Sequence, residues 1–254
     1  MSHVLLRREA ASAEELPSSL DGEPREAARW ILAAAEAGEL QAQALLGQLL
    51  LDGRGIARDA ALARRWFAIA AARGHAMAAN MLGRCLEHGW GGPVDLAAAA
   101  RHYRQAADAG LDWGLYNYAN LLATGRGVAP DDAQALACYR RAAELGHAKS
   151  MNLVGRYCEE GRGVPADARQ ALLWYRRSAE AGDFRGQFSY ASVLAVQGQW
   201  QEARRWLLAA LELGHLKFLR KALAELRQAA LAPLVEVTAA YALRCAELEA
   251  AEAR

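Results

Sequence analysis

The sequence predicts an all-α fold in which antiparallel helix pairs stack into an α-solenoid. Two observations lead to this prediction. Alanine and leucine supply 60 and 37 of the 254 residues, whereas valine, isoleucine and threonine number only 9, 3 and 2. Strong helix formers are abundant and the side chains favoured in strands are scarce, which excludes a sheet-based fold. The second observation is a regular spacing of glycines, which indicates a repeated structural unit.

The glycines define a period of 36 residues, and we say that positions which differ by this period share a phase. Sixteen of the 22 glycines fall on only four phases. Gly214 follows Gly182 after 32 residues, so the fifth unit is shortened. The four phases are those of Gly38, Gly74, Gly110, Gly146 and Gly182; of Gly47, Gly83 and Gly155; of Gly53, Gly89, Gly125 and Gly161; and of Gly55, Gly91, Gly127 and Gly163.

Each unit is predicted to contain two helices. In the first clear copy, one helix covers about 40–51 and ends at Gly53 and Gly55, because glycine adopts the positive φ that closes a helix. The second helix begins after Asp59, whose carboxylate can cap the free backbone N–H groups, and ends at Gly74. Later units repeat the cap at Asp95, Asp131 and Asp167, and a ring recurs at Trp66-Phe67, His102-Tyr103, Cys138-Tyr139 and Trp174-Tyr175.

The combined motif reads Ala42-x-x-x-Leu46-Gly47, then Gly53-x-Gly55-Ile56-x-x-Asp59, then Trp66-Phe67-x-x-Ala70-Ala71-x-x-Gly74. It resembles the Sel1-like repeat, a relative of the tetratricopeptide repeat with a longer loop. Four copies match closely, and a fifth, over about 183–214, lacks the four-residue Gly-x-Gly-Val portion of its loop. The resemblance implies a right-handed α-solenoid of stacked antiparallel helix pairs and a general role as an adaptor.

Three segments follow from this organisation. Residues 24–214 form the repeat solenoid, residues 1–23 form an N-terminal cap or a degenerate first helix, and residues 215–254 form helices that cap the exposed end. The final helix also carries a stripe that would suit a weak dimer instead of a cap, so a monomer and a weak dimer both stay open. The stripe consists of Leu234, Thr238, Tyr241, Cys245 and Leu248.

Catalytic, metal and cofactor chemistry are not expected. No strand precedes a glycine-rich loop, and no nucleophile, base and acid combination is recognisable. His75, His147 and His215 lie whole repeats apart, about 10 Å per unit, whereas metal ligands lie about 2 Å from their ion. The cysteines do not recur at a regular spacing within the repeats. We therefore expect them to be small buried apolar side chains of a protein in a reducing cytoplasm. They are Cys85, Cys138, Cys158 and Cys245.

The charge pattern argues against nucleic-acid and membrane partners. The 30 basic and 29 acidic residues nearly cancel, and no apolar run is long enough to span a bilayer. Arginines recur at one phase of the second helix and could form a basic stripe. Each has an acidic residue four positions later, which neutralises the stripe. A cytoplasmic, non-exported protein is expected, and 27 arginines against three lysines hint at a bacterial source. The pairs are Arg104 with Asp108, Arg140 with Glu144, and Arg176 with Glu180.

The resemblance places function on the first helix of each unit, which lines the concave face in tetratricopeptide-like superhelices. Amides there can hold a peptide backbone, arginine can hold a carboxylate, and rings can act as apolar anchors. We therefore expect a non-catalytic adaptor that binds a partner protein or peptide segment, with acidic residues preferred. The alternatives are a structural role through the convex face or C-terminal helix, and rings that only pack between helices. The expected groove residues are Asn80, Arg84, Trp113, Tyr116, Asn120, Lys149, Asn152, Arg156, Arg185 and Phe188.

Overall fold

A computed structural model describes residues 24–252 of the chain. Within this range the regular structure comprises thirteen α-helices and one 3-10 helix, with no strand, which confirms the all-α prediction. The helix or cap predicted over residues 1–23 lies outside the described residues. By compactness the chain divides into two units, Met1–Cys138 and Tyr139–Arg254, and each is described by itself.

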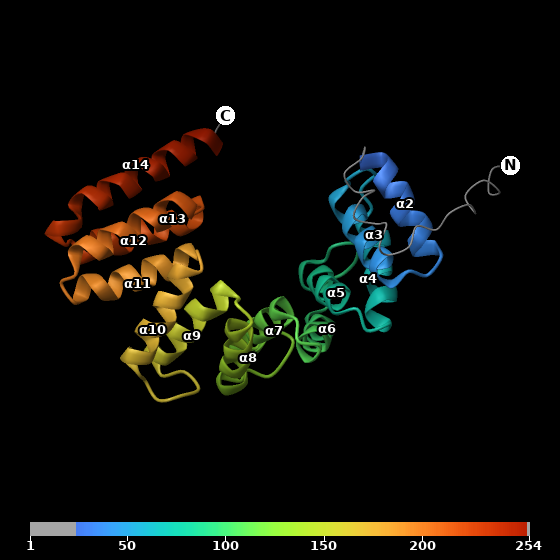
Figure 1. Ribbon diagram of the computed structural model, residues 1–254, viewed down its shortest axis with the longest axis horizontal. Helices are drawn as coiled ribbons and strands as arrows, with labels where there is room; N and C mark the ends of the chain where they lie inside the picture. Colours follow the sequence, from blue (N-terminus) through green and yellow to red (C-terminus); the bar gives the residue numbers. More distant parts are fainter. Residues whose placement is uncertain (1–23, 253–254) are drawn as a thin grey trace. The chain divides into compact units, whose positions relative to one another are not determined.

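The first unit consists of helices that pack against their neighbours along the chain (Figure 1). Contacts between α3 and α5 and between α5 and α7 also join the first helices of successive repeats, so these helices line one side of the stack. The helices are α2 (Pro24–Glu36), α3 (Leu40–Asp52), α4 (Ala60–Ala72), α5 (Ala76–His88), α6 (Leu96–Asp108) and α7 (Asp112–Thr124), and the unit ends within α8 (Asp132–Glu144).

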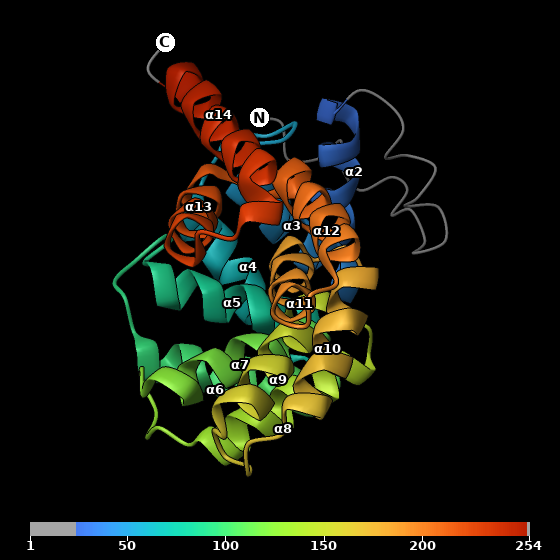
Figure 2. The same ribbon diagram turned by 90° about the vertical axis from the view of Figure 1, so that its left-hand side faces the viewer.

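The second unit repeats this arrangement and then changes at its end (Figure 2). Its first helices α9 and α11 touch each other, whereas the last helix, α14, lies across both α12 and α13. After α8, the elements are α9 (Ala148–Glu160), α10 (Ala168–Glu180), α11 (Phe184–Val196), α12 (Trp200–Leu213), α13 (Leu216–Ala229), the 3-10 helix η1 (Ala232–Leu234) and α14 (Val235–Glu252).

Both ends of the predicted helices are confirmed. The helix predicted over about 40–51 runs to Asp52 and closes at Gly53, which has a φ of 72°. The carboxylate of Asp59 accepts a hydrogen bond from the Leu62 backbone N–H at 2.9 Å and so caps α4. The same acceptor recurs at the starts of α6, α8 and α10, through Asp95, Asp131 and Asp167.

The ring of each second helix packs onto a small residue of the first helix. A Cβ placed on Gly47 would lie 2.7 Å from the ring of Phe67, and one on Gly83 would lie 2.7 Å from that of Tyr103. These rings are at most 1% exposed. Glycine at this phase therefore lets the two helices of a repeat approach closely, and each buried ring contributes roughly 1.5–3 kcal/mol of transfer free energy.

The loop glycines at the phase of Gly55 hold successive repeats together. Gly91 has a φ of 74°, and an added Cβ there would overlap the carbonyl group of Ala60, at the first turn of α4. Gly127 meets Leu96, at the first turn of α6, in the same way. The second glycine of these two loops thus serves both as a left-handed residue and as a contact surface for the preceding repeat.

The predicted C-terminal stripe is largely internal to the protein. Leu234, Tyr241 and Cys245 are buried in one apolar cluster with α12 and α13, and the Tyr241 hydroxyl donates to the Leu207 carbonyl oxygen at 2.8 Å. Pro233 lies in the 3-10 helix that precedes α14. These three residues of the stripe are therefore buried within the second unit.

Candidate functional site

A cavity of about 540 Å³ lies in the second unit, along the first helices of three successive helix pairs. Helices α9, α11 and α13 supply most of its wall, and Tyr175 of α10 completes it. The lining residues are Asn152, Arg156, Glu159, Tyr175, Arg185, Phe188, Ser189, Ser192, Val193, Val196, Phe218, Lys221, Ala222 and Glu225.

Four of the ten groove residues predicted from the sequence meet in this cavity: Asn152, Arg156, Arg185 and Phe188. Asn152 is 5% exposed, and its side-chain oxygen is buried without a hydrogen-bond partner among the described residues. A buried acceptor that lacks a donor costs stability, roughly 1–3 kcal/mol. Such a group therefore marks Asn152 as a candidate for function rather than for packing.

Two cations of the cavity are neutralised within the chain. Arg156 pairs with Glu160 at 3.2 Å, and Lys221 pairs with Glu225 at 3.6 Å. Each pair joins residues four apart on one exposed helix face, where such pairs contribute a few tenths of a kcal/mol.

Two other charges of the cavity have no ion pair within the described part of the chain, namely Arg185 and Glu159. The Arg185 guanidinium lies 4.4 Å from the centre of the Phe184 ring and 3.3 Å from His215 Nε2. The Glu159 carboxylate accepts a hydrogen bond from the Tyr175 hydroxyl at 2.6 Å. Burial, together with this carboxylate, raises the pKa of Tyr175 above its ordinary value, so the phenol remains a donor. The cavity therefore offers one cation and one anion to a ligand.

The apolar part of the cavity is formed by rings and branched side chains. Phe188 is buried and packs edge-to-face on Phe218, with 5.9 Å between ring centres. Val196, at the end of α11, is 87% exposed. A cavity with an apolar wall and a few polar groups is typical of a binding site.

The predicted groove residues of the first unit are engaged with one another or with their neighbours. Asn80 is buried and accepts a hydrogen bond from the Asn117 amide at 2.8 Å. Arg84 lies 5.0 Å from the centre of the Trp90 ring. Trp113 and Tyr116 form an edge-to-face pair with 5.9 Å between ring centres. These residues lie on α5, α7 and the loop after α5, in a unit separate from the cavity.

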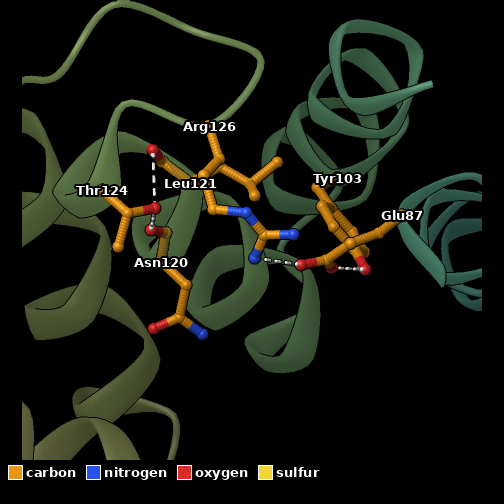
Figure 3. Close-up of polar contacts among 6 residues, drawn as sticks. All are labelled: Glu87, Tyr103, Asn120, Leu121, Thr124 and Arg126. Carbon is orange, nitrogen blue, oxygen red and sulfur yellow. Dashed lines mark hydrogen bonds and ion pairs between the residues drawn. The ribbon is translucent and has the colours of Figure 1, made fainter. Parts of the chain in front are cut away.

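The last two predicted residues are also outside the cavity lining. The Asn120 backbone carbonyl accepts a hydrogen bond from the Thr124 hydroxyl at 2.7 Å, near the end of α7 (Figure 3). Lys149 lies in the first turn of α9, three residues before Asn152. Of the ten predicted groove residues, four therefore line this cavity, and the other six lie outside its lining.

The first unit contains a polar cluster of three residues, Glu87, Tyr103 and Arg126. Glu87 and Tyr103 share their phases with Glu159 and Tyr175 of the second unit. Tyr103 donates to Glu87 at 2.7 Å, and Arg126 donates to the same carboxylate at 2.9 Å (Figure 3). Arg126 comes from the loop after α7, which folds back over the end of α5. Figure 3 shows both donors reaching the carboxylate of Glu87.

A family model described as the Sel1 repeat matches six segments of the chain, residues 20–39, 40–75, 76–111, 114–147, 148–183 and 201–215. The chain belongs to the Sel1 repeat family. Sel1 repeats generally form scaffolds for protein interactions. A comparison with curated proteins gave no match.

Solved structures of Sel1 repeat proteins resemble this fold. A Sel1 repeat protein from Oxalobacter formigenes has 24% sequence identity and a TM-score of 0.81, over 92% of this chain and 97% of that one. The protective antigen c5321 of uropathogenic Escherichia coli, described as displaying an SLR fold, has 26% identity and a TM-score of 0.73. That match covers 88% of this chain but 49% of the E. coli protein, so the chain spans about half its length.

The histidines that follow the repeat glycine cap helices in this Sel1 protein. The Nδ1 atom of His75 accepts a hydrogen bond from the Ala78 backbone N–H at 3.1 Å, and His147 and His215 cap α9 and α13 in the same way. Among residues 24–252, no group of three or more His, Cys, Asp or Glu is placed to hold a metal ion. The three histidines therefore serve as acceptors for backbone N–H groups.

The cysteines are buried as predicted, and two of the three predicted arginine–acid pairs form, whereas Arg140 and Glu144 make no ion pair among the described residues. All four cysteines are buried and free, and burial raises the pKa of Cys85 to about 11, so it stays a thiol. Arg104 and Arg176 pair with Asp108 and Glu180 at 3.7 and 2.8 Å. No helix among the described residues combines the length and the apolar character needed to cross a membrane.

The sequence prediction missed the cavity residues of α13. Phe218, Lys221 and Glu225 lie beyond the shortened fifth repeat, where the 36-residue phases no longer apply, and the segment was predicted to be a cap. A 3/4 spacing of these residues on one helix face was the available signal. Glu159 lies on the first helix of its repeat, but its role depends on a hydrogen bond from another helix that spacing does not reveal.

Proposed function

We propose that this Sel1 repeat protein is a non-catalytic adaptor that binds an extended segment of a partner protein in the cavity of its second unit. The observation that carries the proposal is the buried Asn152 oxygen without a donor, in the wall of a cavity that also holds uncompensated charge. A peptide supplies backbone N–H and C=O groups at regular intervals, and an asparagine amide can bind both.

Two further features support a peptide ligand. Phe188 and Phe218 form an apolar surface suited to a side chain of the segment, and rings of this type are frequent among residues that dominate binding energy. Arg185 is partly exposed without a carboxylate partner, and its planar guanidinium can hold a carboxylate through two hydrogen bonds. An acidic side chain or a terminal carboxylate of the segment fits this position, which keeps the acidic preference expected from the sequence.

The test uses linear peptides selected from a random display library on the full chain, with binding measured by fluorescence anisotropy. Arg185→Ala removes the free cation, and Ser192→Trp fills the cavity from an exposed position of α11. Both variants should weaken binding by roughly tenfold or more. Matched controls are Arg176→Ala, which removes an exposed arginine paired with Glu180, and Gln201→Trp, on the exposed face of α12.

Controls that retain binding while both cavity variants lose it support the proposal. Peptides that bind equally well to all four variants would place the ligand elsewhere on the protein, and the proposal would be wrong. Circular dichroism during heating checks that each variant keeps the helical content and the transition of the parent.

A further inference from the structure

We propose that Glu159 receives a basic side chain, arginine or lysine, from the bound partner segment. The inference rests on the proposed function and adds the chemistry of one position of the ligand. It comes from comparing two copies of the same cluster within the chain.

The first copy shows what a complete cluster contains. Glu87 takes one hydrogen bond from the Tyr103 hydroxyl and a second, charge-assisted bond from Arg126 (Figure 3). The Glu87 side chain is only 14% exposed, so the carboxylate is held between a buried phenol and a guanidinium. A hydrogen-bonded ion pair of this kind is stronger than a neutral hydrogen bond.

The second copy keeps the tyrosine and the glutamate but lacks the arginine. Tyr175 and Glu159 lie 72 residues after Tyr103 and Glu87 and form the same hydrogen bond, at 2.6 Å. The residue 72 positions after Arg126 is Gly198, which has no side chain. In addition, three residues join α11 to α12, whereas seven join α7 to α8, because the fifth repeat lacks the loop that would carry an arginine.

No cation that lines the cavity takes the place of that arginine in the described residues. Arg156 pairs with Glu160, Lys221 pairs with Glu225, and Arg185 lies against Phe184 and His215. The carboxylate instead borders the cavity, where the buried Asn152 oxygen, about two helical turns earlier on α9, also lacks a donor. A basic side chain of a ligand can pair with this carboxylate through charge-assisted hydrogen bonds.

The experiment compares charged and neutral forms of the selected peptides on the full chain. Each peptide is synthesised with its basic residue and with a neutral counterpart, citrulline for arginine or acetyl-lysine for lysine. Both forms are titrated against the parent, Glu159→Gln and Glu87→Gln. The E159Q substitution removes the charge but keeps an amide oxygen that can accept the hydrogen bond from Tyr175. E87Q is the matched control, since Arg126 already occupies that carboxylate.

The expected result is a basic residue shared by the selected peptides, whose neutralisation raises the dissociation constant by roughly tenfold or more. E159Q should weaken the charged peptide to the same extent and leave the neutral peptide unchanged, while E87Q changes neither. If Ser192→Trp abolishes peptide binding but neutralising each basic residue of the peptide leaves the dissociation constant unchanged, this inference is wrong and the proposed function stands. If neither Ser192→Trp nor Arg185→Ala changes the affinity for the peptides, both this inference and the proposed function are wrong.

Discussion

A histidine that caps a helix through Nδ1 has to be neutral, because the protonated ring donates at both nitrogens and cannot accept a backbone N–H. Three of the described first helices begin in this way. The sequence placed these histidines next to the repeat glycine but did not reveal the cap, since serine, threonine, aspartate and asparagine are the preferred cap residues. Asp183, at the same phase, caps α11 with a carboxylate instead.

The neutral cap makes one contribution to stability dependent on pH. Burial lowers the pKa of His75 below its ordinary value of 6.5, so the unfolded chain binds more protons than the folded one as the pH falls below 6.5. The stabilisation is therefore present above pH 6.5 and is lost as the pH falls through the folded pKa. The His75→Asn variant keeps a hydrogen-bond acceptor at every pH. Its free energy of unfolding relative to that of the parent should therefore be about 1 kcal/mol higher at about pH 5 than at about pH 7.5.

Thermal unfolding of the two proteins at both pH values measures this difference. His147 and His215 are present in both proteins, so their contributions cancel. A difference between the two proteins that stays the same at both pH values would contradict a neutral cap at His75.

At the scale of the element, the sequence predicted helix type and helix ends well, because both depend on local chemistry. Glycine at the phase of Gly53 adopts the left-handed conformation, and aspartate at the phase of Asp59 caps the next helix. The partners of polar side chains were less predictable. Asn80 lies on a groove phase, yet it bonds to Asn117 of the next repeat, which depends on how neighbouring helices meet.

The loop glycine at Gly91 supports a prediction about how repeats are held together. Gly91→Ala should be destabilising through its positive φ, about 1–2 kcal/mol, and through overlap with the Ala60 carbonyl group, about 1–3 kcal/mol more. Gly110→Ala is the matched control, since Gly110 has a φ of 81° and no atom within 4 Å of an added Cβ. Urea unfolding of both variants separates the two effects, and equal losses would show that the contact contributes nothing.

At the scale of the whole molecule, the period predicted a repeat protein but not which part of it forms a cavity. The groove phases are the same in both units, while the cavity of the second depends on α13, where the phases are interrupted, and on side chains that lack partners. Absence of a partner is a property of the assembled helices. Spacing along the chain therefore identified Asn152, Arg156, Arg185 and Phe188 without distinguishing them from the engaged residues of the first unit.

The terminal helix allows a prediction about the state of the protein in solution. Truncation before Pro233 removes α14 and uncovers the apolar cluster that contains Leu207, Leu219 and Leu223. The truncated chain should unfold at a lower temperature and show a larger apparent mass by light scattering at several concentrations, because an uncovered apolar surface associates. A full chain that is dimeric and becomes monomeric on truncation would instead support a dimer through this helix.

The short turn at Gly198 has a consequence for how such a protein acquires selectivity. Loss of a loop can leave a carboxylate that is paired within one repeat, as Glu87 is, open to solvent and to a ligand in another repeat, as Glu159 is. No residue of the binding surface has to change. The specificity of a repeat protein can then change through the exchange of a connecting loop. A seven-residue loop with an arginine between α11 and α12, like the one between α7 and α8, would pair with Glu159 within the chain and abolish the preference for basic ligands.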